Sequence, residues 1–89
     1  MLRISQTASN GSHVTLKLEG RIADQWAALL EGECRALLRH DKHVQLDFSD
    51  VDFIDESGIE VVRNFLHNHV AIINAPGFIE ELLQIGGRS

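Results

Sequence analysis

Hydrophobic and polar side chains alternate with period two near the N-terminus, which is the pattern of a half-buried strand. The alternation is clearest over residues 13–20, where valine and leucine side chains are separated by polar ones. Residues 2–6 are predicted to form an edge strand before it, and Asn10-Gly11 between the two is typical of a tight hairpin. Gly20 is expected to end the second strand. The first two strands should therefore pair antiparallel.

The period changes to that of an amphipathic helix over residues 21–40. Apolar side chains recur there mainly at spacings of three and four. Asp24 near the start, and Arg39 and His40 near the end, suit the helix dipole. The predicted apolar face consists of Ala23, Trp26, Ala27, Leu30, Cys34, Leu37 and Leu38.

The second half of the chain repeats the order of strand and helix. Alternation returns over residues 43–55, and a helix is predicted to begin at Ser57 and run to residue 68. Residues 69–75 form a nearly continuous apolar run, which predicts a strand buried on both faces. Pro76 is expected to open the last helix. The side chains predicted to face inward from these two helices are Ile59, Val62, Phe65 and Leu66, and then Phe78, Ile79, Leu82 and Leu83.

The predicted order of elements is strand, strand, helix, strand, helix, strand, helix. Alternating strands and helices favour a parallel sheet with right-handed crossovers. The hairpin adds the first strand as an antiparallel edge. We therefore predict an α/β fold in one domain over residues 1–89, with a mixed four-stranded sheet, a parallel core and about three helices.

Charge and composition narrow the functions that such a domain can have. The net charge of −5 argues against a nucleic-acid partner, because phosphate recognition needs a basic surface. No apolar run approaches the ~20 residues that span a bilayer, so no membrane insertion is expected. Cys34 is the only cysteine, and the N-terminus lacks the apolar core of a signal peptide. These absences predict a cytoplasmic location.

The turn before the second helix contains a candidate cap. Residues 53–60 are FIDESGIE, in which Ser57 followed three residues later by Glu60 fits a capping box. In that arrangement the Ser57 hydroxyl accepts a hydrogen bond from the backbone N–H of Glu60 and stabilises the helix by ~1 kcal/mol. A serine at a helix N-terminus is also a suitable phosphorylation point, because the free N–H groups favour negative charge. The residue types leave both interpretations open.

Three segments of the chain, EGRIADQWAALL, HVQLDFSDVDFIDESGIEVV and VAIINAPGFIEELLQ, carry a family resemblance. Together they resemble the STAS domain, which is found in anti-sigma-factor antagonists, stressosome proteins and sulfate transporters. The resemblance covers residues 12–85, which it identifies as the domain core, and it is most specific at LDFSDVDFIDESGIEVV. It implies a mixed sheet covered by helices that acts as a protein-interaction module.

The resemblance also implies a regulatory turn. In the antagonists, a partner serine kinase phosphorylates the serine directly after an aspartate, and the unphosphorylated form binds the anti-sigma factor. Carried onto this chain, the aspartate is Asp55 and the next residue is Glu56, so a permanent carboxylate replaces the phosphorylatable serine. Ser57 corresponds to the second, usually unmodified serine. The implied partner-binding turn is Asp55, Glu56, Ser57 and Gly58, flanked by Asp50, Asp52, Glu60, Arg63 and Asn64.

Two other functions stay open from the sequence. The chain resembles, in its short C-terminal part, the small STAS subunits of bacterial lipid-transport ABC systems, which bind an ATPase subunit. A small-ligand or nucleotide-sensing domain is a third hypothesis, with a pocket outside the carboxyl ends of the parallel strands. A homodimer is also considered, because an exposed sheet edge can pair with a second copy.

The remaining candidate chemistry is sparse. Six acidic side chains lie within residues 47–60 without a lysine or arginine, which suits a basic partner, a solvated loop or, least well, a cation. His67 and His69 supply two metal ligands without a third, so no metal site is predicted. Cys34 has no activating neighbour in sequence, and no set of base, nucleophile and oxyanion donors is visible. Neither an enzyme nor a cofactor is expected. The six acids are Asp47, Asp50, Asp52, Asp55, Glu56 and Glu60.

Overall fold

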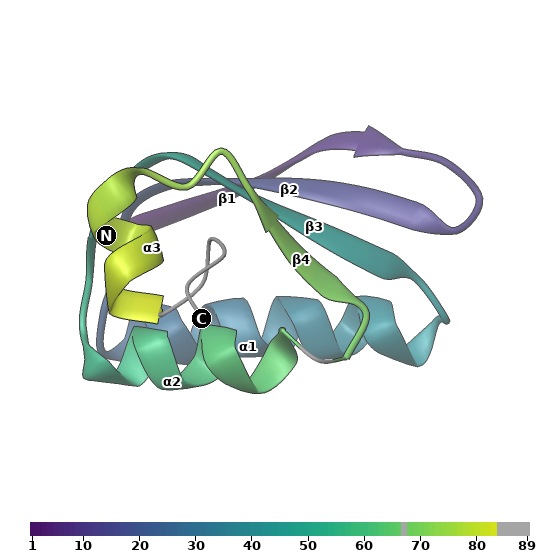
Figure 1. Ribbon diagram of the computed structural model, residues 1–89. Coiled ribbons are helices and arrows are strands. Elements are labelled where there is room, and N and C mark those ends of the chain that lie inside the picture. The colour runs from purple at the N-terminus through teal and green to yellow at the C-terminus, as the bar shows by residue number, and fades with distance from the viewer. Residues whose placement is uncertain (67, 84–89) are drawn as a thin grey trace.

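A computed structural model describes residues 1–66 and 68–83. Four strands form one sheet, α1 and α2 cover one of its faces, and α3 lies at the end where the parallel strands finish (Figure 1). In chain order the elements are β1 (Leu2–Ser9), β2 (His13–Ile22), α1 (Gln25–Arg39), β3 (His43–Ile54), α2 (Glu56–Phe65), β4 (Val70–Ile73) and α3 (Gly77–Leu83). The predicted order of elements and the mixed four-stranded sheet with three helices are confirmed.

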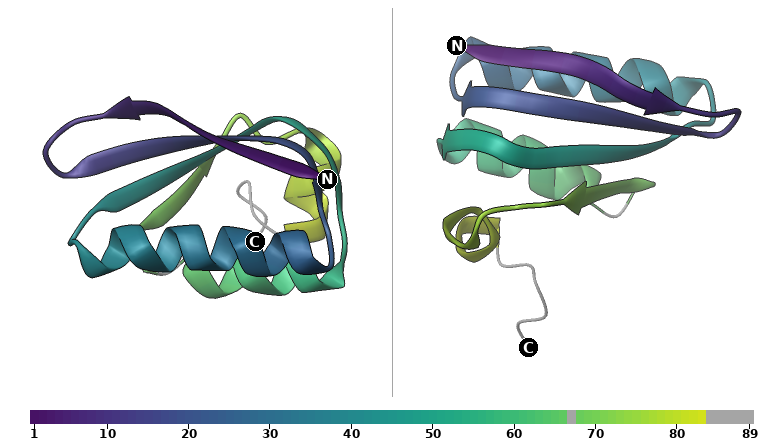
Figure 2. Two further views of the ribbon diagram at one scale, coloured as in Figure 1. Left: turned by 180° about the vertical axis from the view of Figure 1, so that it is seen from behind. Right: turned by 90° about the horizontal axis from the view of Figure 1, so that it is seen from above.

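The strands lie in the order β1-β2-β3-β4, with β1 antiparallel to β2 and the other neighbours parallel (Figure 2). The hairpin forms at the predicted Asn10-Gly11 pair. There the Asn10 side-chain oxygen accepts hydrogen bonds from the backbone N–H groups of Ser12 at 3.2 Å and His13 at 3.0 Å, which is how asparagine stabilises turns. The parallel arrangement places the starts of β2, β3 and β4 at one end of the sheet.

Gly20 does not end β2 as predicted, because the strand continues to Ile22. Its backbone has a φ of 104°, a value that favours glycine, and the register with β3 shifts beside it. The carbonyl oxygen of Met1 lies too close to leave room for a Cβ at this position, and it accepts a hydrogen bond from the Arg21 N–H at 2.8 Å. The glycine therefore marks an irregularity within the strand, where a neighbouring backbone approaches closely.

The core lies between the sheet and the two long helices. Alternate side chains of the central strands point towards the helices, and Leu18, Leu46 and Phe48 are completely buried there. The helices contribute the faces that their periodicity predicted. The buried side chains from α1 include Ala27, Leu30 and Cys34, and those from α2 include Val62 and Phe65, with Ile59 and Leu66 half-buried beside them.

β4 is less buried than its sequence predicts. The prediction of a strand buried on both faces is wrong, because α1 and α2 cover one face of the sheet and no helix within the described residues covers the other. Val70 is buried, but Ala71 is exposed and Ile72 is half-buried. An apolar run of this length does not by itself show whether both faces of a strand are covered.

α3 also departs from the prediction. Ile79 and Leu83 are buried as expected, whereas Phe78 and Leu82 are 47% and 44% exposed. A seven-residue helix at the end of the sheet packs through one narrow side only. The prediction that Phe78 and Leu82 face inward is therefore wrong.

None of the helices in residues 1–66 and 68–83 has the length and apolar character that crossing a bilayer requires.

Candidate functional site

The turn between β3 and α2 is built around Asp55. The residue has extended backbone angles, a φ of −97° and a ψ of −176°, and it is the N-cap of α2. One carboxylate oxygen accepts a hydrogen bond from the backbone N–H of Gly58 at 2.8 Å, and the other accepts one from the backbone N–H of Asp24 at 3.0 Å. Asp24 is the N-cap of α1. A single side chain therefore holds the first turns of two helices, which begin at the same end of the molecule (Figure 1).

The predicted capping box at Ser57 is wrong. α2 begins at Glu56, so Ser57 is its second residue, and the cap is Asp55 two positions earlier. The reason is that β3 runs to Ile54, so the helix starts directly after Asp55, whose carboxylate accepts the orphan N–H of Gly58. The N–H of Glu60, which Ser57 would have capped, lies one turn further into the helix. Ser57 is exposed, as is Glu56. Sequence alone contained the correct signal, because aspartate is as good an N-cap as serine.

Gly58 lies where α2 passes closest to the ends of β2 and β3. A Cβ at this position would be 2.6 Å from the backbone oxygen of Ile22, and 2.8 Å from side-chain carbons of Ile22 and Ile54. Those distances are too short for a real Cβ, so glycine is required for the packing and not for an unusual φ. The close contact fixes the height of the turn above the sheet, and it holds the exposed side chains of Glu56 and Ser57 in place.

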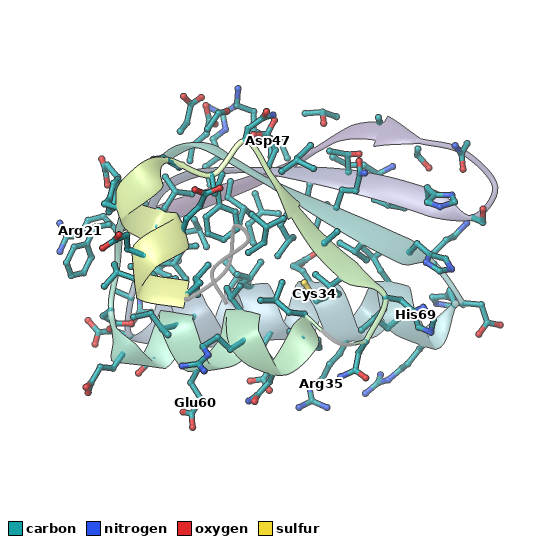
Figure 3. All side chains as sticks on the ribbon, in the orientation of Figure 1. Arg21, Cys34, Arg35, Asp47, Glu60 and His69 are labelled. Carbon is teal, nitrogen blue, oxygen red and sulfur yellow. The ribbon has the colours of Figure 1, made fainter. Side chains whose placement is uncertain are left out.

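The exposed side of α2 continues from this turn. Glu60, Arg63 and Asn64 are all exposed, and Glu60 points away from the core (Figure 3). Together with Glu56 and the half-buried Ile59, they line one shallow, open depression. The residues recur at helical spacings of three and four, so they share one face of the helix. We call this set, Glu56, Ile59, Glu60, Arg63 and Asn64, the α2 face.

The other two flanking residues lie elsewhere. Asp50 forms an ion pair with Lys17, with 3.0 Å between the Lys17 Nζ and an Asp50 carboxylate oxygen. Lys17 alternates along β2 with the buried Leu16 and Leu18, so the pair lies on the face of the sheet opposite the helices. Asp52 is exposed on β3. The structure therefore brings the turn and the α2 face together but separates Asp50 from them.

Asp47 lies on the same open sheet face as Lys17, with which it is in register. Its carboxylate accepts a hydrogen bond from the backbone N–H of Ser49 at 3.0 Å. That bond, helped by the Ser49 and Asn74 side chains and the Lys17 charge, lowers the pKa of Asp47 below 3.8, although partial burial opposes the shift. The acidic residues are thus divided among β3, the turn and α2, and they do not surround one point.

Cys34 is completely buried on the inner side of α1. Burial is the main reason that its pKa is raised to about 12, and the charge of Glu33 adds to the effect. A thiol with this pKa is protonated at neutral pH, and so it is a poor nucleophile. The residue acts as a small apolar member of the core.

A partly apolar surface at the same end of the molecule was missed by the sequence reasoning. The guanidinium of Arg21 lies over the ring of Phe53, 4.3 Å from its centroid, and the pair sits beside α3 (Figure 3). Phe53 is 38% exposed. Such cation–π contacts stabilise an exposed aromatic ring. The sequence signal was Phe53 itself, an aromatic residue at an outward position of a strand.

Solved structures share this fold. SpoIIAA, an anti-sigma-factor antagonist, in its unphosphorylated form matches with a TM-score of 0.76 and 14% identity, over 94% of this chain and 84% of that one. Mglu matches with a TM-score of 0.66 and 21% identity, over 84% of this chain but only 19% of that one. A protein with a SpoIIAA-like fold from Shewanella loihica PV-4 matches with a TM-score of 0.59 and 15% identity, over 90% of this chain and 71% of that one. At such identities the likeness shows the fold alone.

The family is shown by a match of the amino-acid sequence to a family model. No curated protein matches the sequence. A family model described as "Mlab, STAS domain" matches residues 5–88, a range that includes most of β1, the other three strands, the turn and the α2 face. Because this match covers far more than half of the chain, the chain belongs to the STAS domain family of the Mlab type.

Proposed function

We propose that this protein is a non-enzymatic binding module of the anti-sigma-factor-antagonist kind, and that it holds a protein partner at residues 55–58 and the α2 face. The observation that carries the proposal is the pair of hydrogen bonds that the Asp55 carboxylate accepts, which ties the turn to both helices. A turn fixed in this way loses little conformational freedom when a partner binds. The two hydrogen bonds therefore favour a docking surface that is already formed before the partner binds, and not a loop that folds on contact.

The chemistry of the α2 face sets the partner's side of the interface. Glu56 and Glu60 are negative, Arg63 is positive, and Ile59 supplies half-buried apolar area between them. A matching partner surface would offer basic groups opposite the two glutamates and an acidic group opposite Arg63. Charges of this kind mainly speed encounter and select the partner, whereas the apolar centre contributes to affinity.

Glu56 gives the turn a negative charge that is always present. The residue lies where, by resemblance, antagonists have a serine that a kinase modifies, and its carboxylate is exposed at the first position of α2. A carboxylate carries about one negative charge, compared with about −1.5 to −2 for a phosphate, and no kinase or phosphatase can change it. Partner binding is therefore not switched at this position.

The second candidate partner is the ATPase subunit of a lipid-transport ABC system. Two observations favour it: the family match is described for a Mlab STAS domain, and the fixed charge of Glu56 suits a subunit that stays bound. The same turn and the α2 face would form the contact.

We further propose a cytoplasmic location, no nucleic-acid partner and no membrane insertion. Pairing of two copies at the β4 edge is a separate proposal, because that edge is open in the described residues.

The identity of the partner distinguishes these functions. Wild-type protein, Glu56→Ser and Ser57→Ala are used as baits in native lysate, and the captured proteins are quantified by mass spectrometry. An anti-sigma factor or serine kinase whose recovery changes more with Glu56→Ser than with Ser57→Ala supports the first function. A transporter ATPase captured equally by all three baits supports the second. Capture of neither class by the wild type contradicts both.

A further inference from the structure

A repeated dipeptide opens the three parallel strands. His13-Val14 begins β2, His43-Val44 begins β3, and His69-Val70 leads into β4. The three valines are in register across the sheet, and His13 is paired with His43. The histidines therefore lie side by side at the end of the sheet opposite Asp55, near the place where Figure 3 labels His69.

The three imidazoles are in direct contact. The ring centroids of His13 and His43 are 5.0 Å apart with 25° between the ring planes, and those of His43 and His69 are 4.7 Å apart at 76°. All three residues are exposed. Backbone hydrogen bonds hold the main chain beside these side chains in place. The His43 N–H donates to the carbonyl oxygen of Ser12 at 2.7 Å, and the Val44 N–H donates to that of His69 at 2.9 Å.

We propose that His13, His43 and His69 form a binding site for a divalent transition-metal ion of the zinc type, with His43 as the central ligand. Imidazole nitrogens are preferred ligands of such ions. His13 and His43 stack, His69 meets His43 edge-on, and no group of three candidate ligands in residues 1–66 and 68–83 is arranged to hold a metal ion as it stands. Binding therefore requires the rings to turn until their nitrogens lie roughly 3.3 Å apart, as Zn–N bonds of about 2.0–2.1 Å in a tetrahedral site dictate. Their exposure permits that rotation.

The surroundings support ligation by the outer nitrogens. The Ser12 hydroxyl lies 3.0 Å from Nδ1 of His13, so it can accept that N–H and leave Nε2 free for a metal, which is the usual arrangement of ligating histidines. Asp41 lines a shallow depression together with His43 and His69, and its carboxylate offers an oxygen ligand and a negative charge. Lys42 lines the same depression and opposes a cation, but its ammonium donates to the Gly11 carbonyl at 2.7 Å.

The sequence reasoning did not find this site. As metal ligands it weighed only His67 with His69, and His67 lies outside the described residues. Histidines about 30 positions apart become neighbours only when the strands pair in parallel and in register. The signal was the repeated His-Val at the start of three predicted strands. The site lies at the opposite end of the strands from the turn, so it does not depend on the proposed function.

The site is tested by calorimetric titration of the full chain, without an affinity tag, with zinc chloride. We expect one ion per chain, and we expect His43→Gln to weaken binding more than tenfold, since even loss of an outer partner of a ligand costs 10–100-fold. His40→Gln is the matched control, because His40 is an exposed histidine at the end of α1 outside the cluster. Its binding should equal that of the wild type.

A second readout uses thermal unfolding of the same proteins. Because the ligands come from the starts of three strands, zinc should raise the Tm of the wild type and of His40→Gln but not that of His43→Gln. Circular dichroism checks that the variants are folded. The proposal is overturned if the wild type does not bind zinc, or if His43→Gln binds as tightly as the wild type. It is also overturned if His67→Gln removes binding while His43→Gln does not, which would place the site on residues 67–69.

Discussion

A carboxylate oxygen of Asp55 accepts a hydrogen bond from the backbone N–H of Asp24 at 3.0 Å, across 31 positions of sequence. Asp24 has a φ of 53° and a ψ of −126°, which a non-glycine residue rarely adopts. Its own side chain makes no capping bond to α1. Asp55 therefore stabilises an unfavourable backbone conformation at one helix start while it caps the other.

Asp55→Ala is expected to lower the free energy of unfolding by about 2 kcal/mol, because both the α2 cap and the bond to Asp24 are lost. Ser57→Ala, two positions later, should change it by less than about 0.5 kcal/mol, since Ser57 is an exposed residue that does not cap the helix. Urea unfolding of the two variants measures the difference. Equal losses of unfolding free energy in the two variants would support a cap at Ser57 and contradict the assignment of Asp55 as the cap.

Gly58→Ala should destabilise the protein by about 2 kcal/mol or more, because the new methyl group would overlap the Ile22 backbone and two isoleucine side chains. The matched control is Gly32→Ala on α1, where a Cβ meets nothing within 4 Å. That change should raise stability by about 0.5–1 kcal/mol, as expected for an exposed helical glycine. Denaturant midpoints with unchanged slopes give both values. A neutral Gly58→Ala would mean that α2 does not pack as closely as described.

Asp47 should make stability sensitive to acid. Its pKa is lowered from 3.8, first by the hydrogen bond from the Ser49 N–H. A lowered folded-state pKa adds stability that is fully present above the ordinary value and is lost as the pH falls through the folded value. The stability difference between wild type and Asp47→Asn should therefore be larger at pH 6 than at pH 2.5. Urea titrations at both pH values measure it, and a gap independent of pH would contradict the shift.

Cys34 should be unreactive in the folded protein. Its thiol is fully buried, and burial raises its pKa to about 12. We expect iodoacetamide at pH 8 to leave the native protein unmodified and to label it completely in urea, as mass spectrometry would show. Rapid labelling without urea would mean that α1 opens readily or that the thiol is accessible.

Much of the fold was predictable because its signals are local. The alternation of Val14, Leu16 and Leu18 fixed a strand and its buried face, and Asn10-Gly11 fixed the hairpin. The errors concern choices between local alternatives of similar energy or properties set by distant segments. Both Asp55 and Ser57 are good caps, and only the end of β3 decides between them.

The exposure of the late elements depends on tertiary arrangement. β4 has an exposed Ala71 because α1 and α2 lie on one face of the sheet, which its own four residues do not encode. Phe78 and Leu82 are exposed because α3 lies at the end of the sheet. In the candidate site, the resemblance implied the turn and its flanking residues on the following helix, whereas helical spacing had placed Ile59 on the inward face. The separation of Asp50 from them required the register of β2 with β3.

The central claim is that a partner binds at the α2 face, and charge reversal there tests it most directly. Arg63→Glu changes an exposed residue of that face, and Arg39→Glu is its matched control. Both arginines lie in the last turn of a helix, so both reversals carry a similar helix-dipole penalty. The amount of the partner captured by each variant is measured relative to the wild type.

We predict that Arg63→Glu reduces capture at least tenfold and that Arg39→Glu leaves it unchanged, with both variants folded by circular dichroism. Equal capture by both variants, or equal loss in both, would contradict a binding surface on α2.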